Sequence, residues 1–230
     1  MQLQLGEPMS PVPSVIVFDV NETLSDMRPM AARFTDIGAP DHLARLWFTL
    51  LRDGFALTAA GAQRPFADLG VDALHSVLNG VDLDRDLDAA VDHVMRGFGE
   101  LSLHADVAEG IPALHRSGRR LVTLTNGATQ VAERLFAEAG IRDEFEAQLS
   151  VEDAGAWKPA RAAYEYAAQR CDTELADMLL VAVHPWDIDG AARAGMATAW
   201  ISRSAVPYPR CFAVPSLTAT SLPELAGQLT

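Results

Sequence analysis

Three separate apolar stretches of this chain end abruptly in small or polar residues, and a helical pattern follows each of them. They run from Val15 to Phe18, from Leu121 to Leu124 and from Leu179 to Val183. Buried parallel strands have this pattern, and their carboxyl ends meet at one edge of a sheet, where ligands bind. The feature predicts an α/β chain with a doubly wound parallel sheet and a polar site at that edge.

The order of the remaining segments supports the same class of fold. Strands alternate with helices of ordinary length after residue 106, which is typical of a Rossmann-like sheet with right-handed crossovers. The segment 203–216, which contains three prolines, predicts a surface connection before a final strand and helix. We expect strands at residues 14–20, 120–124, 147–150, 178–183 and 198–202, and helices at 106–117, 128–139, 160–170 and 187–194.

The region between residues 27 and 103 has a different character. Apolar residues recur at helical spacing over 41–60, 65–78 and 84–101, and no strand-like alternation is present there. This pattern predicts an all-helical insert directly after the first strand.

Composition excludes several classes of partner. The net charge is -13 over 230 residues, which opposes binding to nucleic acid or to an anionic membrane. No apolar run approaches the roughly 20 residues of a membrane-spanning helix. Residues 1–14 contain three prolines and no basic region before an apolar block, so we interpret them as a tail and not as a signal peptide.

The two cysteines, Cys171 and Cys211, have no metal-binding spacing. Two reduced thiols are typical of a cytoplasmic protein. The six histidines form no HxxxH pattern and the chain has no CxxC pattern, so nothing indicates zinc.

Asp19 is the first candidate for chemistry, because it follows a buried strand and would face the crevice at the sheet edge. An aspartate in that place can equally cap a turn, so the interpretation depends on the other stretches. Lys158 lies between Trp157 and Pro159, and a lysine beside a carboxylate keeps it ionised and nucleophilic. We therefore predict a nucleophilic Asp19 next to Lys158.

Polar residues also follow the other two strands. Thr125 and Asn126 stand where a strand turns into a helix, and free amides at such a turn bind anions, although Asn-Gly also occurs in plain turns. Asp187 is a candidate to hold Lys158 or to orient water, besides favouring the helix dipole. His184 is a candidate hydrogen-bond donor or general base, or a structural histidine. Trp186 offers an apolar wall and one indole donor.

The ordered set of these stretches resembles the haloacid dehalogenase superfamily, and the helical insert stands where that family has its cap. Within the family the pattern is similar to the L-2-haloacid dehalogenase (type II) branch, from residue 15 to about residue 222. The resemblance implies a Rossmann-like catalytic core of residues 12–26 and 104–230, with residues 27–103 as the inserted cap. Together with the apolar insert, it also favours a homodimer.

Carried over by position, the resemblance implies Asp19 as the nucleophile and Thr23 as its hydrogen-bonding support. Thr125 stands where the branch usually has a serine that binds the substrate carboxylate. The implied catalytic residues are Asp19, Lys158, Asp187, Thr23 and His184, and the implied substrate-binding residues are Val20, Asn21, Thr125, Asn126, Phe48, Arg52, Trp186 and Tyr164.

Two positions separate this chain from the family's phosphatases. Those enzymes place an acidic proton donor two residues after the nucleophile, where this chain has Asn21. They also use an aspartate of the last motif as a magnesium ligand, where this chain has Val183. Magnesium neutralises phosphoryl charge, and halide displacement needs neither group. We therefore expect no metal and no cofactor.

Other positions depart from the dehalogenase branch itself. Its cap arginine, which helps to capture the halide, is replaced by Phe48, and Arg45 or Arg52 on the same helix face is a candidate substitute. Ala182 and His184 replace a serine and an asparagine of the last motif. The halide pocket is therefore expected to differ from that of a typical member.

These inferences predict a metal-independent hydrolytic dehalogenase that converts small 2-haloalkanoic acids to 2-hydroxy acids through an ester on Asp19. Its partner would be the small-molecule 2-haloacid, without nucleic acid or membrane. Two alternatives stay open at this point. One is a phosphatase-type member with unusual metal ligation, and the other is a non-catalytic binding protein on the same scaffold.

Overall fold

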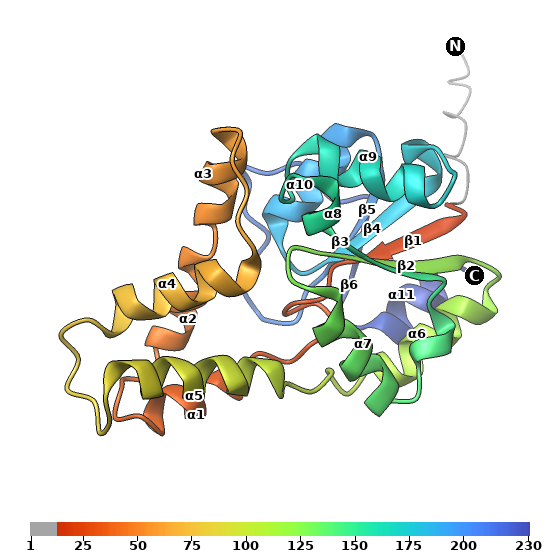
Figure 1. Ribbon diagram of the computed structural model, residues 1–230. Coiled ribbons are helices and arrows are strands. Elements are labelled where there is room, and N and C mark those ends of the chain that lie inside the picture. The colour runs from red at the N-terminus through yellow and green to blue at the C-terminus, as the bar shows by residue number, and fades with distance from the viewer. Residues whose placement is uncertain (1–12) are drawn as a thin grey trace, which may run out of the picture.

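The computed structural model describes residues 13–230 of the chain, and its core is a six-stranded sheet in the order β3-β2-β1-β4-β5-β6 (Figure 1). Every neighbouring pair is parallel, which confirms the predicted fold class. The tail predicted for residues 1–14 lies outside the described residues up to residue 12. The strands are β1 (Val15–Phe18), β2 (Arg120–Thr125), β3 (Ala147–Ser150), β4 (Met178–Ala182), β5 (Ala197–Ile201) and β6 (Leu217–Ala219).

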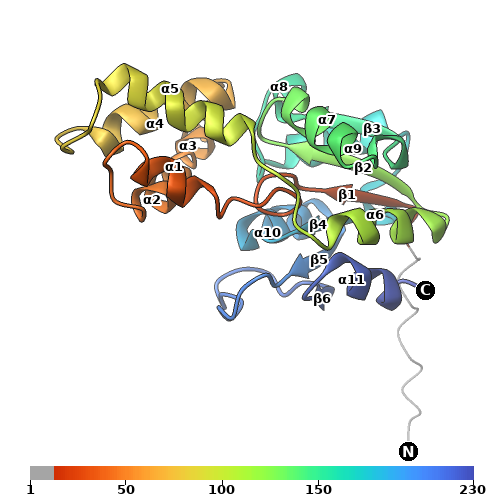
Figure 2. The same cartoon turned by 90° about the horizontal axis from the view of Figure 1, so that it is seen from below.

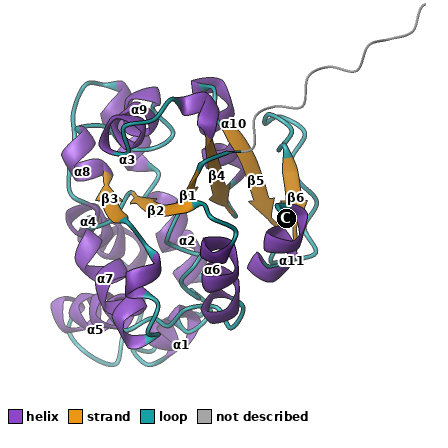
Figure 3. Cartoon of the chain, turned by 90° about the vertical axis from the view of Figure 1, so that its right-hand side faces the viewer, coloured by secondary structure: helices purple, strands orange, loops and turns teal. Residues whose placement is uncertain are grey.

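Helices cover both faces of the sheet (Figure 3). Ile16 and Phe18 of β1 pack into one apolar cluster with the helices of one face, while Val15 and Val17 join the cluster of the other face. A strand covered on both sides has no polar alternation, which is why β1 is apolar throughout. One face carries α6 (Val107–Arg116), α7 (Thr129–Glu138) and α11 (Leu222–Gln228), and the other carries α9 (Arg161–Arg170) and α10 (Pro185–Ala194). The short α8 (Val151–Ala154) follows β3.

A separate group of helices lies beyond the carboxyl ends of the strands (Figures 1 and 2). It is inserted between β1 and α6, as the sequence predicted. Its two connections to the core run side by side: Ser25 and Leu103 form an antiparallel bridge, and the His104 N–H donates to the Leu24 carbonyl (2.9 Å). The helices are α1 (Met30–Thr35), α2 (Leu43–Leu50), α3 (Asp53–Ala59), α4 (Phe66–Leu78) and α5 (Leu87–Gly99).

The helix expected over residues 41–60 is two helices, α2 and α3, separated at Leu51 and Arg52. α3 packs closely on the core, because a Cβ atom added to Gly54 would lie 2.5 Å from a ring carbon of Trp157. The structure also contains α1 and α8, which sequence periodicity did not predict. Among the described residues, no helix is both long and apolar enough to cross a bilayer.

Candidate active site

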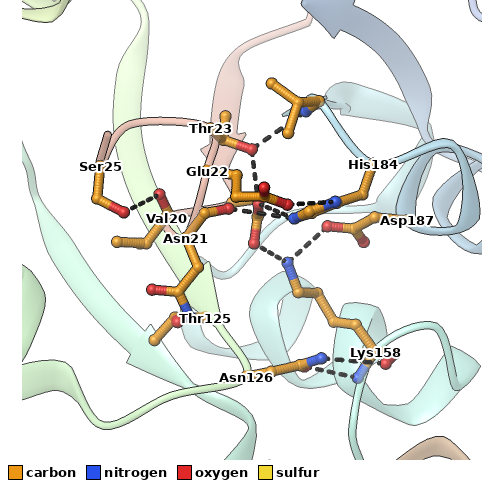
Figure 4. A network of polar contacts seen from close by, with 12 residues as sticks. Val20, Asn21, Glu22, Thr23, Ser25, Thr125, Asn126, Lys158, His184 and Asp187 are labelled. Atoms are coloured by element: carbon orange, nitrogen blue, oxygen red, sulfur yellow. Dashed lines mark hydrogen bonds and ion pairs between the residues drawn. The ribbon is translucent and has the colours of Figure 1, made fainter. Parts of the chain in front are cut away.

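Three charged side chains from different parts of the chain meet at the carboxyl edge of the sheet. Asp19 follows β1, Lys158 lies in the loop before α9, and Asp187 lies in the first turn of α10. The Lys158 Nζ donates to Asp19 Oδ1 (2.9 Å) and to Asp187 Oδ2 (2.6 Å), and the contact to Asp187 is visible in Figure 4. Lys158 and Asp187 are fully buried, and Asp19 is nearly so. The ammonium thus joins two carboxylates that are almost out of water.

The ammonium of Lys158 and the carboxylate of Asp19 each stabilise the charged form of the other. Burial alone would raise the pKa of Asp19, but the ammonium of Lys158 and the ring of His184 outweigh it, so that pKa is lowered. Burial alone would lower the pKa of Lys158, but Asp187 and Asp19 outweigh it, so that pKa is raised. Asp19 is therefore a carboxylate at neutral pH, and Lys158 is an ammonium.

Asp187 pairs with Lys158 and is itself fixed by a second hydrogen bond. Burial raises the pKa of Asp187, Lys158 opposes this, and the nearby Asp19 carboxylate adds to it. Both of its oxygens accept hydrogen bonds of 2.6 Å, one from Lys158 and one from the hydroxyl of Tyr164, an arrangement that a carboxylate satisfies. Burial and Asp187 raise the pKa of Tyr164 well above its usual value, so Tyr164 donates to Asp187 as a neutral phenol.

Thr23 fixes the second oxygen of the nucleophile candidate. Its hydroxyl donates to Asp19 Oδ2 (2.6 Å) and accepts from the N–H of Val183 (3.1 Å). Because the hydroxyl proton is directed to Asp19, the carboxylate plane is held by Thr23 on one side and by Lys158 on the other. The orientation of Asp19 is therefore set before any ligand arrives.

Asn126 is hydrogen-bonded to the backbone of the loop before α9 that carries Lys158, called the lysine loop below. Its carboxamide accepts from the N–H of Lys158 (3.0 Å) and donates to the carbonyl of the same residue (3.2 Å), as Figure 4 shows. The Thr125 oxygen accepts from the N–H of Gly127 (3.0 Å), so its hydroxyl proton points elsewhere. Within residues 13–230, the backbone N–H groups of Asn21 and Asn126 donate to no protein acceptor, and both remain available to an anion.

His184 lies beside the nucleophile candidate, at the N-terminal cap of α10. Its Nε2 is 3.1 Å from the carbonyl oxygen of Asn21 and 3.6 Å from Asp19 Oδ2. Its Nδ1 is 3.7 Å from a carboxylate oxygen of Glu22. Glu22 was not predicted as a site residue. Its position beside His184 depends on its positive φ of 62°, which neither its residue type nor its spacing indicates.

A cleft of about 1180 Å³ opens above these residues, between the helical insert and the core. Asp19, Asn21, Asn126 and His184 line it from the core. The predicted Val20 is buried in the core cluster and has its side chain away from the cleft. The residues that line the opposite and side walls include Phe48, Arg45, Arg52, Phe55, Phe66, Trp157 and Trp186.

The donor set around the nucleophile candidate does not suit magnesium. The ammonium of Lys158 already lies between Asp19 and Asp187, and Val183 offers no side-chain oxygen. Over residues 13–230 there is no group of three or more His, Cys, Asp or Glu side chains that could hold a metal ion.

Comparison with known proteins assigns the family. A model of haloacid dehalogenase-like hydrolases matches residues 13–195. The chain therefore belongs to the haloacid dehalogenase-like hydrolase family. It is 29% identical over 216 residues to the (S)-2-haloacid dehalogenase of Pseudomonas sp. (strain YL), covering 90% of both chains. It is 28% identical to haloacetate dehalogenase H-2 of Moraxella sp. (strain B), covering 88% of this chain and 92% of that one.

Solved structures agree with these relatives. The fold is similar to that of a dehalogenase with an intermediate complex, with a TM-score of 0.87 at 26% identity, over 94% of this chain and 97% of that one. An L-2-haloacid dehalogenase gives a TM-score of 0.86 at 28% identity, over 94% and 98% of the two chains. These matches confirm the predicted branch and the prediction of a hydrolase similar to (S)-2-haloacid dehalogenases.

Proposed function

We propose that this chain is a hydrolytic dehalogenase that converts small 2-haloalkanoic acids to 2-hydroxy acids through a covalent ester on Asp19. One observation carries the proposal above all others. Asp19 lines the cleft as an oriented, ionised carboxylate held by Lys158 and Thr23, and the residue two positions later, Asn21, is not an acid. The names of the relatives support the same reaction.

In the first step, one oxygen of Asp19 attacks the carbon that carries the halogen. A carbon–oxygen bond forms while the carbon–halogen bond breaks, and the halide leaves with the bonding electron pair on the opposite side. Lys158 keeps Asp19 deprotonated for this attack. The carbon centre is therefore inverted.

In the second step, water attacks the carboxyl carbon of Asp19. The water proton passes to Asp187 or His184, and a proton returns to the oxygen of the departing product as the ester bond breaks. The product is a 2-hydroxy acid, and Asp19 is regenerated. Two easier steps thus replace one difficult displacement.

The substrate carboxylate would bind at the turn after β2. The free N–H groups of Asn126 and Asn21 and the Thr125 hydroxyl proton provide its donors. Phe48, Trp186 and the exposed Arg52 would then line the halogen side of the cleft.

We also propose that residues 27–103 act as a cap over a catalytic core of residues 12–26 and 104–230, of which residue 12 lies outside the described residues. The paired connections at Ser25 and Leu103 are where such a cap would move. Closure would limit water during the first step. The reaction as proposed needs neither metal nor cofactor. The homodimer and the cytoplasmic location stay predictions.

Halide release from 2-chloropropionate, with and without a chelator, tests the proposal. Release that the chelator does not affect supports a metal-independent dehalogenase. Phosphate release from phosphate esters only with magnesium would instead support a phosphatase, and turnover of neither would support a binding protein.

The nucleophile is tested by Asp19→Asn, which replaces the attacking oxygen with a weak nucleophile. We expect kcat/KM to fall by about 10³-fold or more. Asp189→Asn is the matched control, because Asp189 pairs with Arg193 on α10 and does not line the cleft. In heavy-oxygen water, a single turnover should put label into Asp19; label in the product alone would refute the ester intermediate.

A further inference from the structure

Arg203 lies in the connection between β5 and β6, and each of its three guanidinium nitrogens donates to a protein acceptor. The Nε and Nη2 atoms both donate to the carbonyl oxygen of Thr23 (3.1 and 2.8 Å). The Nη1 atom donates to Asp106 Oδ1 (2.8 Å). The arginine thus joins the β5–β6 connection to the turn that follows the nucleophile candidate. Sequence analysis placed Arg203 in a surface connection and gave it no role.

The acidic partner of Arg203 is itself fixed. Asp106 precedes the first residue of α6, and its second oxygen accepts from the N–H of Leu222 at the start of α11 (2.9 Å). The side chains of Arg203 and Asp106 are only 17% and 18% exposed. Because Asp106 is tied to the starts of two helices that pack on the sheet, the guanidinium is held in one place.

The carbonyl of Thr23 depends on this arginine. Thr23 is fully buried, and within residues 13–230 no backbone N–H donates to its carbonyl oxygen. A buried carbonyl that lacks a donor is costly. The preceding residue, Glu22, has a φ of 62°, and such a conformation persists only where neighbouring contacts hold it. Arg203 at the Thr23 carbonyl and His104 Nε2, 3.0 Å from the Glu22 carbonyl oxygen, are those contacts.

The side chain of Thr23 orients the nucleophile candidate (Figure 4). Its hydroxyl donates to Asp19 Oδ2 (2.6 Å) and accepts from the N–H of Val183 (3.1 Å). The carbonyl of Val183 accepts from the indole N–H of Trp200 (3.0 Å), so Val183 is held independently of Thr23. A shift of the Thr23 backbone would therefore break the contacts of its hydroxyl and would not carry Val183 with it.

We propose that Arg203 is a positioning residue for the nucleophile: by holding the Thr23 carbonyl, it places the hydroxyl that fixes the plane of Asp19. The effect on turnover rests on the proposed function. The attacking oxygen must lie close to the halogen-bearing carbon and in line with the bond that breaks, and a displacement of about 1 Å can cost about 10²-fold in rate. Lysine carries the same charge as arginine but has no planar fork of N–H groups, so it can replace Arg203 only in part.

The first test measures halide release from 2-chloropropionate by Arg203→Met and Arg203→Lys. We expect kcat to fall by about 10²-fold in the first variant and by about tenfold in the second, with KM within about twofold of the wild type. Arg193→Met is the matched control and should leave kcat unchanged, because Arg193 donates to Asp189 on α10 and does not line the cleft. Arg203 does line the cleft, so a raised KM with an unchanged kcat would assign it to substrate binding and overturn the proposal.

Coupling to Thr23 separates a positioning role from a general loss of structure. In Thr23→Val the hydroxyl is already absent, so adding Arg203→Met should lower the single-turnover rate by only about twofold or less. If Arg203→Met does not fold, Arg203→Lys takes its place in both backgrounds. An arginine that merely supports the fold would lower the rate by the same factor with and without the hydroxyl, and equal factors would overturn the proposal.

Hydrogen exchange followed by NMR tests the same link without turnover. The N–H of Val183 donates to the Thr23 hydroxyl, so its exchange should be about tenfold faster or more in Arg203→Lys. The N–H of Asp19 donates to the Val181 carbonyl (3.1 Å) and should exchange as in the wild type. Unchanged exchange at Val183, or equal acceleration at both amides, would overturn the proposal. If the wild type releases no halide, the proposed function fails, and this measurement still decides the link from Arg203 to Thr23.

Discussion

At the scale of single residues, the central feature is a buried ammonium between two buried carboxylates. Taking such charges out of water is costly, and close hydrogen bonds offset that cost only while all partners are present. Lys158 donates to both Asp19 and Asp187, and Tyr164 supplies a further donor to Asp187. The cluster is therefore sensitive to the loss of any one member.

This predicts a specific result for Lys158→Met. The variant leaves two buried carboxylates without a cation, so unfolding free energy should fall by about 3–5 kcal/mol, as measured by urea denaturation. Turnover should be lost as well, because Asp19 would no longer be held ionised. Adding Asp187→Asn should recover part of the stability, since one uncompensated charge disappears, but not the activity. A Lys158→Met variant of wild-type stability would contradict the role of Lys158 as a buried counter-ion.

Sequence reasoning located some site residues and missed others for a physical reason. Asp19 and Asp187 were found because a strand end or a helix start fixes where such side chains point. Lys158 was found from its position between Trp157 and Pro159. The contact of Glu22 with His184 depends on a positive φ. The engagement of Asn126 with Lys158 joins residues 32 positions apart. Neither feature leaves a trace in residue spacing.

At the scale of elements, α10 and the lysine loop are in close contact through Gly190. A Cβ atom added there would lie 2.5 Å from Pro159 Cβ and 2.6 Å from the Tyr164 hydroxyl. The α10 helix begins with Pro185 in its first turn and carries Asp187 toward the lysine. The absence of a side chain at Gly190 therefore allows helix, loop and tyrosine to meet.

We predict that Gly190→Ala lowers both stability and activity. The added methyl group must displace the Tyr164 hydroxyl from Asp187 or move the loop, at a cost of about 1–3 kcal/mol. Gly227→Ala on α11 is the matched control, because nothing lies within 4 Å of its added Cβ. That substitution should stabilise the protein by about 0.5–1 kcal/mol. Thermal denaturation of both variants checks the pair, and a destabilising Gly227→Ala would show that the Gly190 effect is not steric.

Periodicity identified most helices but joined two of them. The apolar stripe of residues 41–60 continues across the junction of α2 and α3, so the sequence pattern contains no signal for a break. The direction of α3 depends on Gly54 packing against the ring of Trp157, a contact between residues far apart in sequence. Local patterns predict which segments are helical, and tertiary packing decides where one ends.

At the scale of the whole molecule, the helical insert contacts the core next to the lysine loop. The N–H of Trp157 donates to the Thr58 hydroxyl (3.1 Å), and its indole Nε1 donates to the Arg64 carbonyl (3.2 Å). Lys158 directly follows Trp157, so the insert helps to fix the loop that carries the lysine. The insert is thus part of the framework of the site as well as a wall of the cleft.

The ionisation of the tyrosines reports on whether the protein is folded. The chain has three of them. Burial and Asp187 raise the pKa of Tyr164 well above its usual value, and burial and Asp189 raise the pKa of Tyr208 to about 12. A tyrosine with a raised folded pKa contributes stability below pH 10 that is lost as pH rises through the folded value. Unfolding free energy should therefore fall as pH rises above about 10.

Tyrosinate absorbance at about pH 10.5 measures this directly, because an ordinary tyrosine is mostly ionised there. In the folded protein Tyr164 and Tyr208 should stay neutral, and adding urea should release their absorbance. In Tyr164→Phe the increase on unfolding should be smaller by one tyrosine. If the folded protein already showed the signal of all three tyrosines, Tyr164 would be open to solvent. The buried contact that fixes Asp187, and through it Lys158, would then not exist in solution.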